Sequence, residues 1–118
     1  MSFSFGASIM FETRSLDILK NAIHVMENGF NTLPEYESPV DMKAVAGVIH
    51  EVAEMMHDNY PYFHPLYAGQ MLKPPHPVAR IAYMLAMYMN PNNHALDGGP
   101  ASSRMEKEAV SAIATMLG

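Results

Sequence analysis

The chain has 118 residues, a formal net charge of −5 and no cysteine, which leaves room for one domain without a disulfide framework or a cysteine-based metal site. Its seven Lys and Arg residues are scattered singly, so no basic stripe suits nucleic acid or an anionic membrane. We expect a cytoplasmic protein, because the first residues do not form a signal peptide and the longest apolar run, residues 81–89, is too short to span a bilayer.

The first half of the chain predicts two amphipathic helices. Residues 15–28 carry apolar side chains at steps of three and four, with Asp17 in the first turn and Gly29 beyond the end. The second helix is expected from Ser38-Pro39, a capping residue followed by proline, to about His57. Its stripe consists of Met42, Val45, Ile49, Val52 and Met56. The short connector predicts that the two helices form an antiparallel hairpin.

The second half predicts another helical pair. Residues 75–89 are apolar on every side except for Arg80 and two tyrosine hydroxyls, so this helix needs cover on all faces. We expect some of that cover to come from a second chain, with the first hairpin swinging out to pack on it. A fourth helix is expected after Ala101, where Ser103 and Glu106 have capping-box spacing. No segment alternates with period two, so the predicted fold is all-α, as two helical hairpins.

Two loops bracket the third helix and combine rigid turn residues with hydrogen-bonding and aromatic side chains. The first runs from Tyr60 through Tyr-Pro-Tyr-Phe-His-Pro-Leu-Tyr-Ala-Gly-Gln, and the second reads Asn-Pro-Asn-Asn-His-Ala-Leu-Asp-Gly-Gly-Pro from Asn90. This composition is typical of loops that line a site on a packed scaffold.

Histidines offer two weaker alternatives. His50, Glu54 and His57 share one face of the second helix, and Glu-x-x-His is the spacing used in di-iron bundles, although no other helix supplies the remaining ligands. The loop histidines are candidates for zinc, but their spacing fits no compact pattern. They are His64, His76 and His94. We favour a solvated polar face for the first group and loop hydrogen bonds for the second.

Four motifs stand in order along residues 60–118: His64-Pro65-Leu66-Tyr67, Pro77-Val78-Ala79, Gly99-Pro100-Ala101 and Met105-Glu106. In this order and with similar gaps, they resemble the amino-terminal part of the group II amino-acid decarboxylases, which depend on pyridoxal phosphate (PLP). The resemblance is closest to bacterial aromatic-amino-acid and tyrosine decarboxylases. Residues 16–59 share only the helical pattern.

The resemblance implies a fold type I PLP enzyme that works as a homodimer and exchanges its amino-terminal hairpin between subunits. Residues 1–59 would be that hairpin. Residues 60–118 would be pocket-lining loops and two helices leading into a PLP-binding domain outside this chain. The Schiff-base lysine of the family follows a histidine, and no lysine here does. The chain is therefore expected to be inactive alone and to contain no catalytic residue.

The same resemblance implies the substrate-binding residues. Residues 67–72 correspond to the family segment that lines the side-chain pocket, and residues 92–96 to the one that reaches the neighbouring subunit's pocket. We expect Tyr67, Gln70, Leu72 and His94 to face a small amino-acid substrate. Where family members often carry aromatics, this chain has Gly69-Gln70 and His94. A polar aromatic amino acid such as tyrosine is therefore the expected substrate, with glutamate second. The alternative function is a small helical dimerisation module without catalysis.

Overall fold

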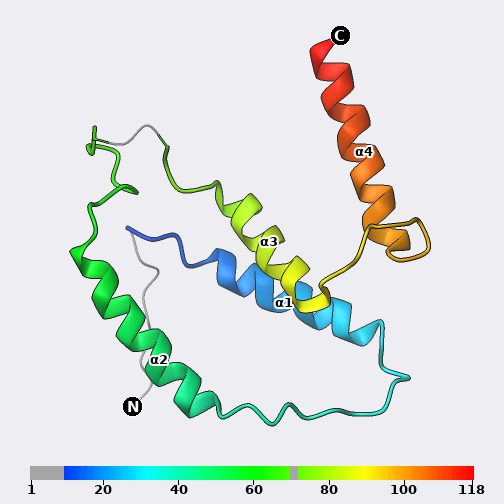
Figure 1. Ribbon diagram of the computed structural model, residues 1–118, viewed down its shortest axis with the longest axis horizontal. Coiled ribbons are helices and arrows are strands. Elements are labelled where there is room, and N and C mark those ends of the chain that lie inside the picture. The colour runs from blue at the N-terminus through cyan, green and yellow to red at the C-terminus, as the bar shows by residue number, and fades with distance from the viewer. Residues whose placement is uncertain (1–9, 70–71) are drawn as a thin grey trace.

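The structure, a computed structural model, describes residues 10–69 and 72–118. Within these ranges the chain forms four α-helices and one short 3-10 turn, and no strand (Figure 1). The elements are α1 (Ser15–Asn28), α2 (Met42–Met55), η1 (Met56–Asp58), α3 (Pro77–Met89) and α4 (Pro100–Leu117). The all-α prediction is confirmed, and the bounds of α1 agree with those expected from its stripe.

The starts of the other helices differ from the prediction. Helix α2 begins three residues after Pro39, because the Asp41 carboxylate accepts hydrogen bonds from the amides of Lys43 (2.9 Å) and Ala44 (3.1 Å). Asp41 is thus the N-cap in place of Ser38. At α3, the Nδ1 atom of His76 accepts from the Val78 amide at 3.2 Å, and Pro77 takes the first helical position.

The predicted capping box of α4 is wrong. Gly99 precedes the helix, Pro100 occupies its first turn, and Ser103 lies buried inside it. The Glu106 carboxylate instead accepts a hydrogen bond from a loop asparagine. The end of α3 follows the expected pattern, since Asn90 adopts the left-handed conformation (φ 46°) directly before Pro91.

Helices α1 and α3 form the only packed pair of α-helices in the described part of the chain. Figure 1 shows them side by side, running in the same direction, with α2 apart from them and α4 projecting away. The Arg80 guanidinium supports the pair by donating to the Glu12 carbonyl at 3.1 Å, and the rings of Phe11 and Phe63 lie 4.4 Å apart. The predicted pairings of α1 with α2 and of α3 with α4 are therefore wrong.

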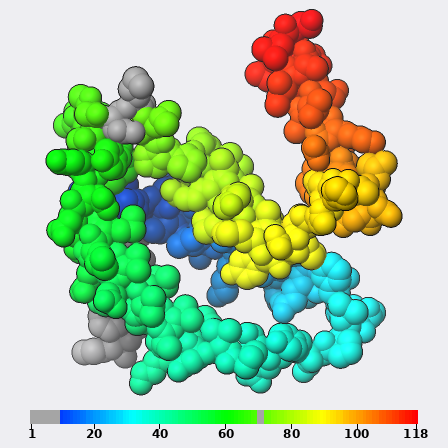
Figure 2. All heavy atoms as spheres, viewed as in Figure 1, coloured from blue at the N-terminus to red at the C-terminus, as the bar shows by residue number. Residues whose placement is uncertain are grey.

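The described residues bury very little apolar surface. Leu19 is the one large hydrophobic residue among them that counts as buried, at 8 % exposure. The Cα radius of gyration is 18.7 Å, against about 13–14 Å for a compact domain of this length. The accessible surface is 11199 Å², against about 6,400 Å² for a compact monomer of this mass. Figure 2 shows the same open outline, with α4 standing away from the rest.

None of the helices in residues 10–69 and 72–118 is both long and apolar enough to cross a membrane.

Candidate functional site

The first candidate surface is the tyrosine loop, residues 60–69. The Tyr67 ring packs edge-on against Tyr62 (5.4 Å between centroids) and stacks on Tyr60 (6.2 Å). The backbone turns tightly here, because the His64 amide donates to Pro61 O (2.9 Å) and the Tyr67 amide to His64 O (3.0 Å). The loop therefore holds Tyr67 half-buried among its own aromatics.

Lys73 braces this loop from its far end. Its ammonium donates to the carbonyls of Tyr67 (2.8 Å) and His64 (3.2 Å) and lies 5.7 Å from the centre of the Tyr67 ring. Two charge-assisted hydrogen bonds and a cation–π contact thus fix the backbone on either side of the loop tip. A Cβ atom at Gly69 would lie 2.5 Å from the Tyr67 hydroxyl, so a larger residue there would require the Tyr67 ring to shift.

Leu72, another predicted substrate-binding residue, follows the tyrosine loop. Leu72 points into solvent, with 77 % of its surface exposed. Gln70 lies outside the described residues. Within the described residues, the structure thus provides an aromatic platform at Tyr67, formed by the rings of Tyr60, Tyr62 and Tyr67.

The second candidate surface is the asparagine loop, residues 90–99, folded against the start of α4. A cavity of about 460 Å³ lies between them. It is lined by Asn93, His94, Ala95, Leu96, Ser103, Glu106, Lys107, Val110 and Ser111. Both charged and apolar groups reach this space, as in sites that bind small polar ligands.

The side chain of His94 is exposed on this loop and does not stabilise the loop's turns. The backbone amide of His94 donates to Asn92 Oδ1 at 2.9 Å, while its residue surface is exposed. The loop hydrogen bond that the sequence favoured for the His94 side chain is not made to any of the described residues. The loop's turns are stabilised by Asn92, Asn93 and the Gly98 amide, which donates to Ala95 O at 3.0 Å.

The two loops extend from opposite ends of α3. Helix α3 has 13 residues and is about 20 Å long, and the loops that carry Tyr67 and His94 lie beyond its opposite ends. Figure 1 shows the tyrosine loop before α3 and the asparagine loop beyond it. Tyr67 and His94 are therefore separated within a single chain.

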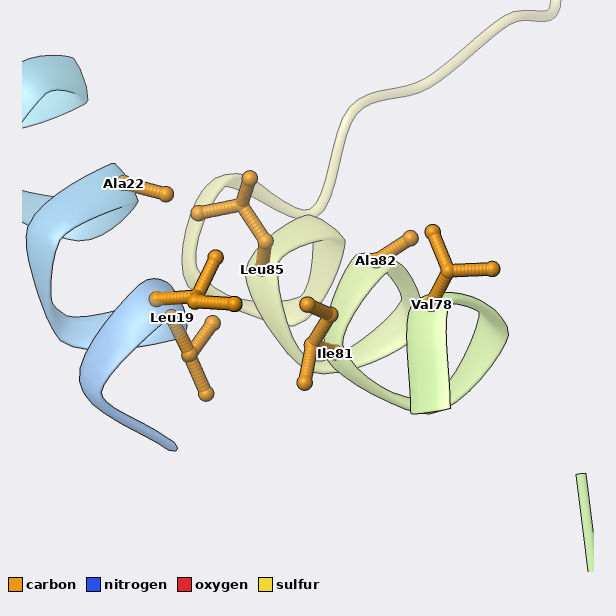
Figure 3. Close-up of a pocket in the computed structure, with 7 residues that line it drawn as sticks. Leu19, Ala22, Val78, Ile81, Ala82 and Leu85 are labelled. Atoms are coloured by element: carbon orange, nitrogen blue, oxygen red, sulfur yellow. The ribbon is translucent and has the colours of Figure 1, made fainter. Parts of the chain in front are cut away.

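A third feature is an apolar groove of about 180 Å³ between α1 and α3. Leu19 and Ala22 of α1 face Ile81 and Leu85 of α3 across it, and Val78 and Ala82 extend the apolar lining (Figure 3). No polar side chain lines it, so an apolar helix face fits this groove better than a polar small molecule does.

Glu12 is the one group in the described residues with a clearly shifted pKa. Its carboxylate is close to the Ser15 hydroxyl, accepts from the Ser15 amide at 3.1 Å and pairs with Arg14 at 3.4 Å, and together these lower its pKa below 4.5. The Ser15 hydroxyl makes the largest contribution, although it meets no strict hydrogen-bond geometry. The firmer contact is therefore the Ser15 amide, which ties Glu12 to the start of α1.

The histidine groups considered from the sequence are dispersed. His50 pairs only with Glu54 on exposed α2, at 3.3 Å, and His64 and His76 each accept a backbone amide through Nδ1. No three His, Asp or Glu side chains among the described residues come close enough to hold a metal ion.

Comparison with protein-family models, with curated protein sequences and with solved structures finds no match.

Proposed function

We propose that this chain is the amino-terminal part of a PLP-dependent L-amino-acid decarboxylase, where it supplies dimer contacts and substrate-pocket loops. The observation that carries the proposal is the placement of two internally braced loops at opposite ends of α3. These are the segments that the resemblance assigns to the substrate pockets of two different subunits. A separation of about 20 Å is expected if each loop serves a different pocket of a dimer.

A homodimer would also cover the surfaces that the chain leaves open. Helix α2 and the 3-10 turn that follows it carry an exposed apolar stripe of Met42, Val45, Ile49, Val52 and Met56. The α1–α3 groove is lined by apolar side chains only. Seating the α2 of one chain on the α1–α3 pair of its partner would bury both and pair each tyrosine loop with the partner's asparagine loop. In this arrangement the two subunits would exchange α2 alone, whereas the sequence predicted the exchange of a hairpin of α1 and α2.

The residues present do not fit PLP by themselves. All four lysines are exposed (Lys20, Lys43, Lys73 and Lys107), and Lys73 is engaged by loop carbonyls. The cofactor supplies the electron sink for decarboxylation. In the proposed enzyme, the cofactor's lysine and phosphate-binding residues would belong to a separate PLP-binding domain.

Within the proposed pocket, Tyr67, Gln70, Leu72 and His94 would contact the substrate side chain. A polar group aimed at the substrate discriminates strongly, because an unmatched analogue leaves it buried and unpaired. We therefore propose a polar aromatic amino acid, with tyrosine first and glutamate second.

The test is to express the complete reading frame that contains these residues and to assay carbon dioxide release from a panel of L-amino acids. We expect carbon dioxide to be released from at least one amino acid, and we expect the purified protein to show the absorbance of bound PLP. His94→Ala should raise KM or reorder the substrates while PLP occupancy stays unchanged. A reading frame without a later His-Lys pair, or a protein without activity on any amino acid, would refute the proposal. Loss of PLP in His94→Ala would refute the pocket role of His94 alone.

A second candidate function, a helical dimerisation module without catalysis, is favoured by the exposed stripe of α2 and the open α1–α3 groove. It requires association but no continuation into a PLP domain. A dimer formed by a reading frame without that domain would support this alternative.

A further inference from the structure

The asparagine loop is fastened to α4 through a single side-chain amide. Asn93 Nδ2 donates to Glu106 Oε2 at 3.2 Å, and Asn93 Oδ1 accepts from the Ser102 hydroxyl. The same hydroxyl lies 3.3 Å from Gly99 O at the start of the helix. Both ends of the Asn93 amide are therefore bonded to α4, one turn apart along the helix.

Two glycines allow this close approach. A Cβ atom at Gly99 would lie 2.7 Å from Asn93 Oδ1 and 2.6 Å from Ser102 Oγ. At Gly98 it would lie 2.8 Å from the backbone oxygen of Asn92. Glycine at position 98 thus leaves room for the tight turn of the loop backbone, and glycine at position 99 leaves room for the contact between Asn93 and Ser102.

The residues bonded to Asn93 are not those expected to touch substrate. His94, the next residue, is exposed and makes no side-chain hydrogen bond to the described residues, so its position is set by its neighbours. Asn92 holds the His94 amide, and Asn93 fixes the loop on α4. We infer that Asn93 and Glu106 are positioning residues that fix the asparagine loop on α4 and so determine where His94 is presented. That His94 meets a substrate rests on the proposed function, whereas the fastening of the loop does not.

The direction of the Asn93–Glu106 hydrogen bond gives a sharp test. Asn93→Asp removes the donor and places two carboxylates about 3 Å apart, while it keeps the acceptor for Ser102. Glu106→Gln keeps an acceptor for Asn93. In the double variant, Asn93→Asp with Glu106→Gln, the new amide can donate to the new carboxylate, so the bond re-forms in the opposite direction.

Asn92→Asp is the matched control, because it makes the same chemical change one residue earlier but keeps the oxygen that accepts from His94. Glu108→Gln is the control for the loss of one α4 charge, since Glu108 is exposed and has no hydrogen-bond partner in the described structure. All variants can be made in the 118-residue chain, with circular dichroism to verify that helix content is retained.

We expect hydrogen exchange at the amides of His94 and Gly98 to be about 3-fold to 10-fold faster in Asn93→Asp, as for the loss of one exposed hydrogen bond. Rates should return to within about 2-fold of the original in the double variant and stay there in both controls. The NMR chemical shifts of the His94 ring protons should change in Asn93→Asp, return in the double variant and stay unchanged in both controls. Equal exchange in Asn93→Asp and Asn92→Asp, or no recovery in the double variant, would overturn the inference.

A complete enzyme adds a readout that separates positioning from folding. There, Asn93→Asp should raise KM with little change in kcat, and the double variant should reverse the rise. If the complete protein proves inactive on amino acids, the proposed function fails while the exchange results still decide the role of Asn93 and Glu106.

Discussion

Asp41 sets the start of α2 through one carboxylate oxygen that accepts two backbone amides. Asp41→Ala should therefore destabilise α2 by about 1 kcal/mol, the usual effect of losing an N-cap. Exchange of the Lys43 and Ala44 amides would report it. Ser38→Ala is the matched control and should change neither amide, because Ser38 lies outside the helix. A larger effect at Ser38 than at Asp41 would contradict this assignment.

The ionisation of Glu12 should make the contacts at the start of α1 depend on pH. Hydrogen bonding to Ser15 and pairing with Arg14 lower its pKa, so the ionised carboxylate favours the folded contacts. For a lowered carboxyl pKa, this contribution is complete above about pH 4.5 and disappears as the pH falls through the lowered value. The Ser15 amide shift should titrate in this acidic range and stay flat in Glu12→Gln. An unchanged titration in that variant would assign the effect to another group.

At the scale of single elements, the sequence predicts a helix well but places its capping residue less reliably. The stripe of α1 gave its bounds, because apolar spacing extends over the whole helix. The start of α2 depends on which of Ser38 and Asp41 reaches the free amides, and both are preferred capping residues. In α4, Glu106 has the spacing for a capping box, but its carboxylate accepts a hydrogen bond from Asn93, which lies 13 residues earlier in the sequence.

Helix α2 contains a glycine that no tertiary contact requires. A Cβ atom added at Gly47 would have nothing within 4 Å. Gly47→Ala should therefore stabilise α2 by about 0.5–1 kcal/mol, since glycine costs backbone entropy in a helix. Helix content measured by circular dichroism should rise. Gly98→Ala is the contrasting variant: its Cβ would lie 2.8 Å from a backbone oxygen, so it should loosen the asparagine loop.

The α1–α3 pair depends on one side chain more than on any other described residue. Leu19 is the buried hydrophobic side chain between them. Leu19→Ala should weaken the packing by about 2 kcal/mol, the low end for a leucine truncation, because the groove beside it is already open. Faster exchange in the middle of α3 would report the loss. Val25→Ala, on the same helix but 73 % exposed, should leave α3 unchanged.

For the whole molecule, the sequence predicts the helices but not their partners. The loop from Gly29 to Asp41 lacks regular structure and is long enough to carry α2 away from α1, so neighbours in sequence need not be neighbours in space. The choice of α3 as the partner of α1 depends on matching side chains such as Leu19, Ile81 and Leu85. The pocket residues could be proposed only from the resemblance. The contact of Asn93 with Ser102 and Glu106 could not be predicted, because no sequence pattern links these three residues.

The exposed area of the whole chain argues for association. Its surface exceeds that of a compact monomer by about 4,800 Å², while a stable dimer interface buries about 800 Å² or more on each partner. We therefore expect the chain to sediment as a dimer at micromolar concentration. Ile49→Asp, in the middle of the α2 stripe, should weaken the dimer at least about tenfold, because a charge would replace an apolar group that is 61 % exposed in the single chain and would be buried in the dimer. Ala44→Asp adds the same charge on the far side of α2 and should leave the dimer intact. A monodisperse compact monomer, or equal weakening by both variants, would show that the α2 stripe is not the dimer surface.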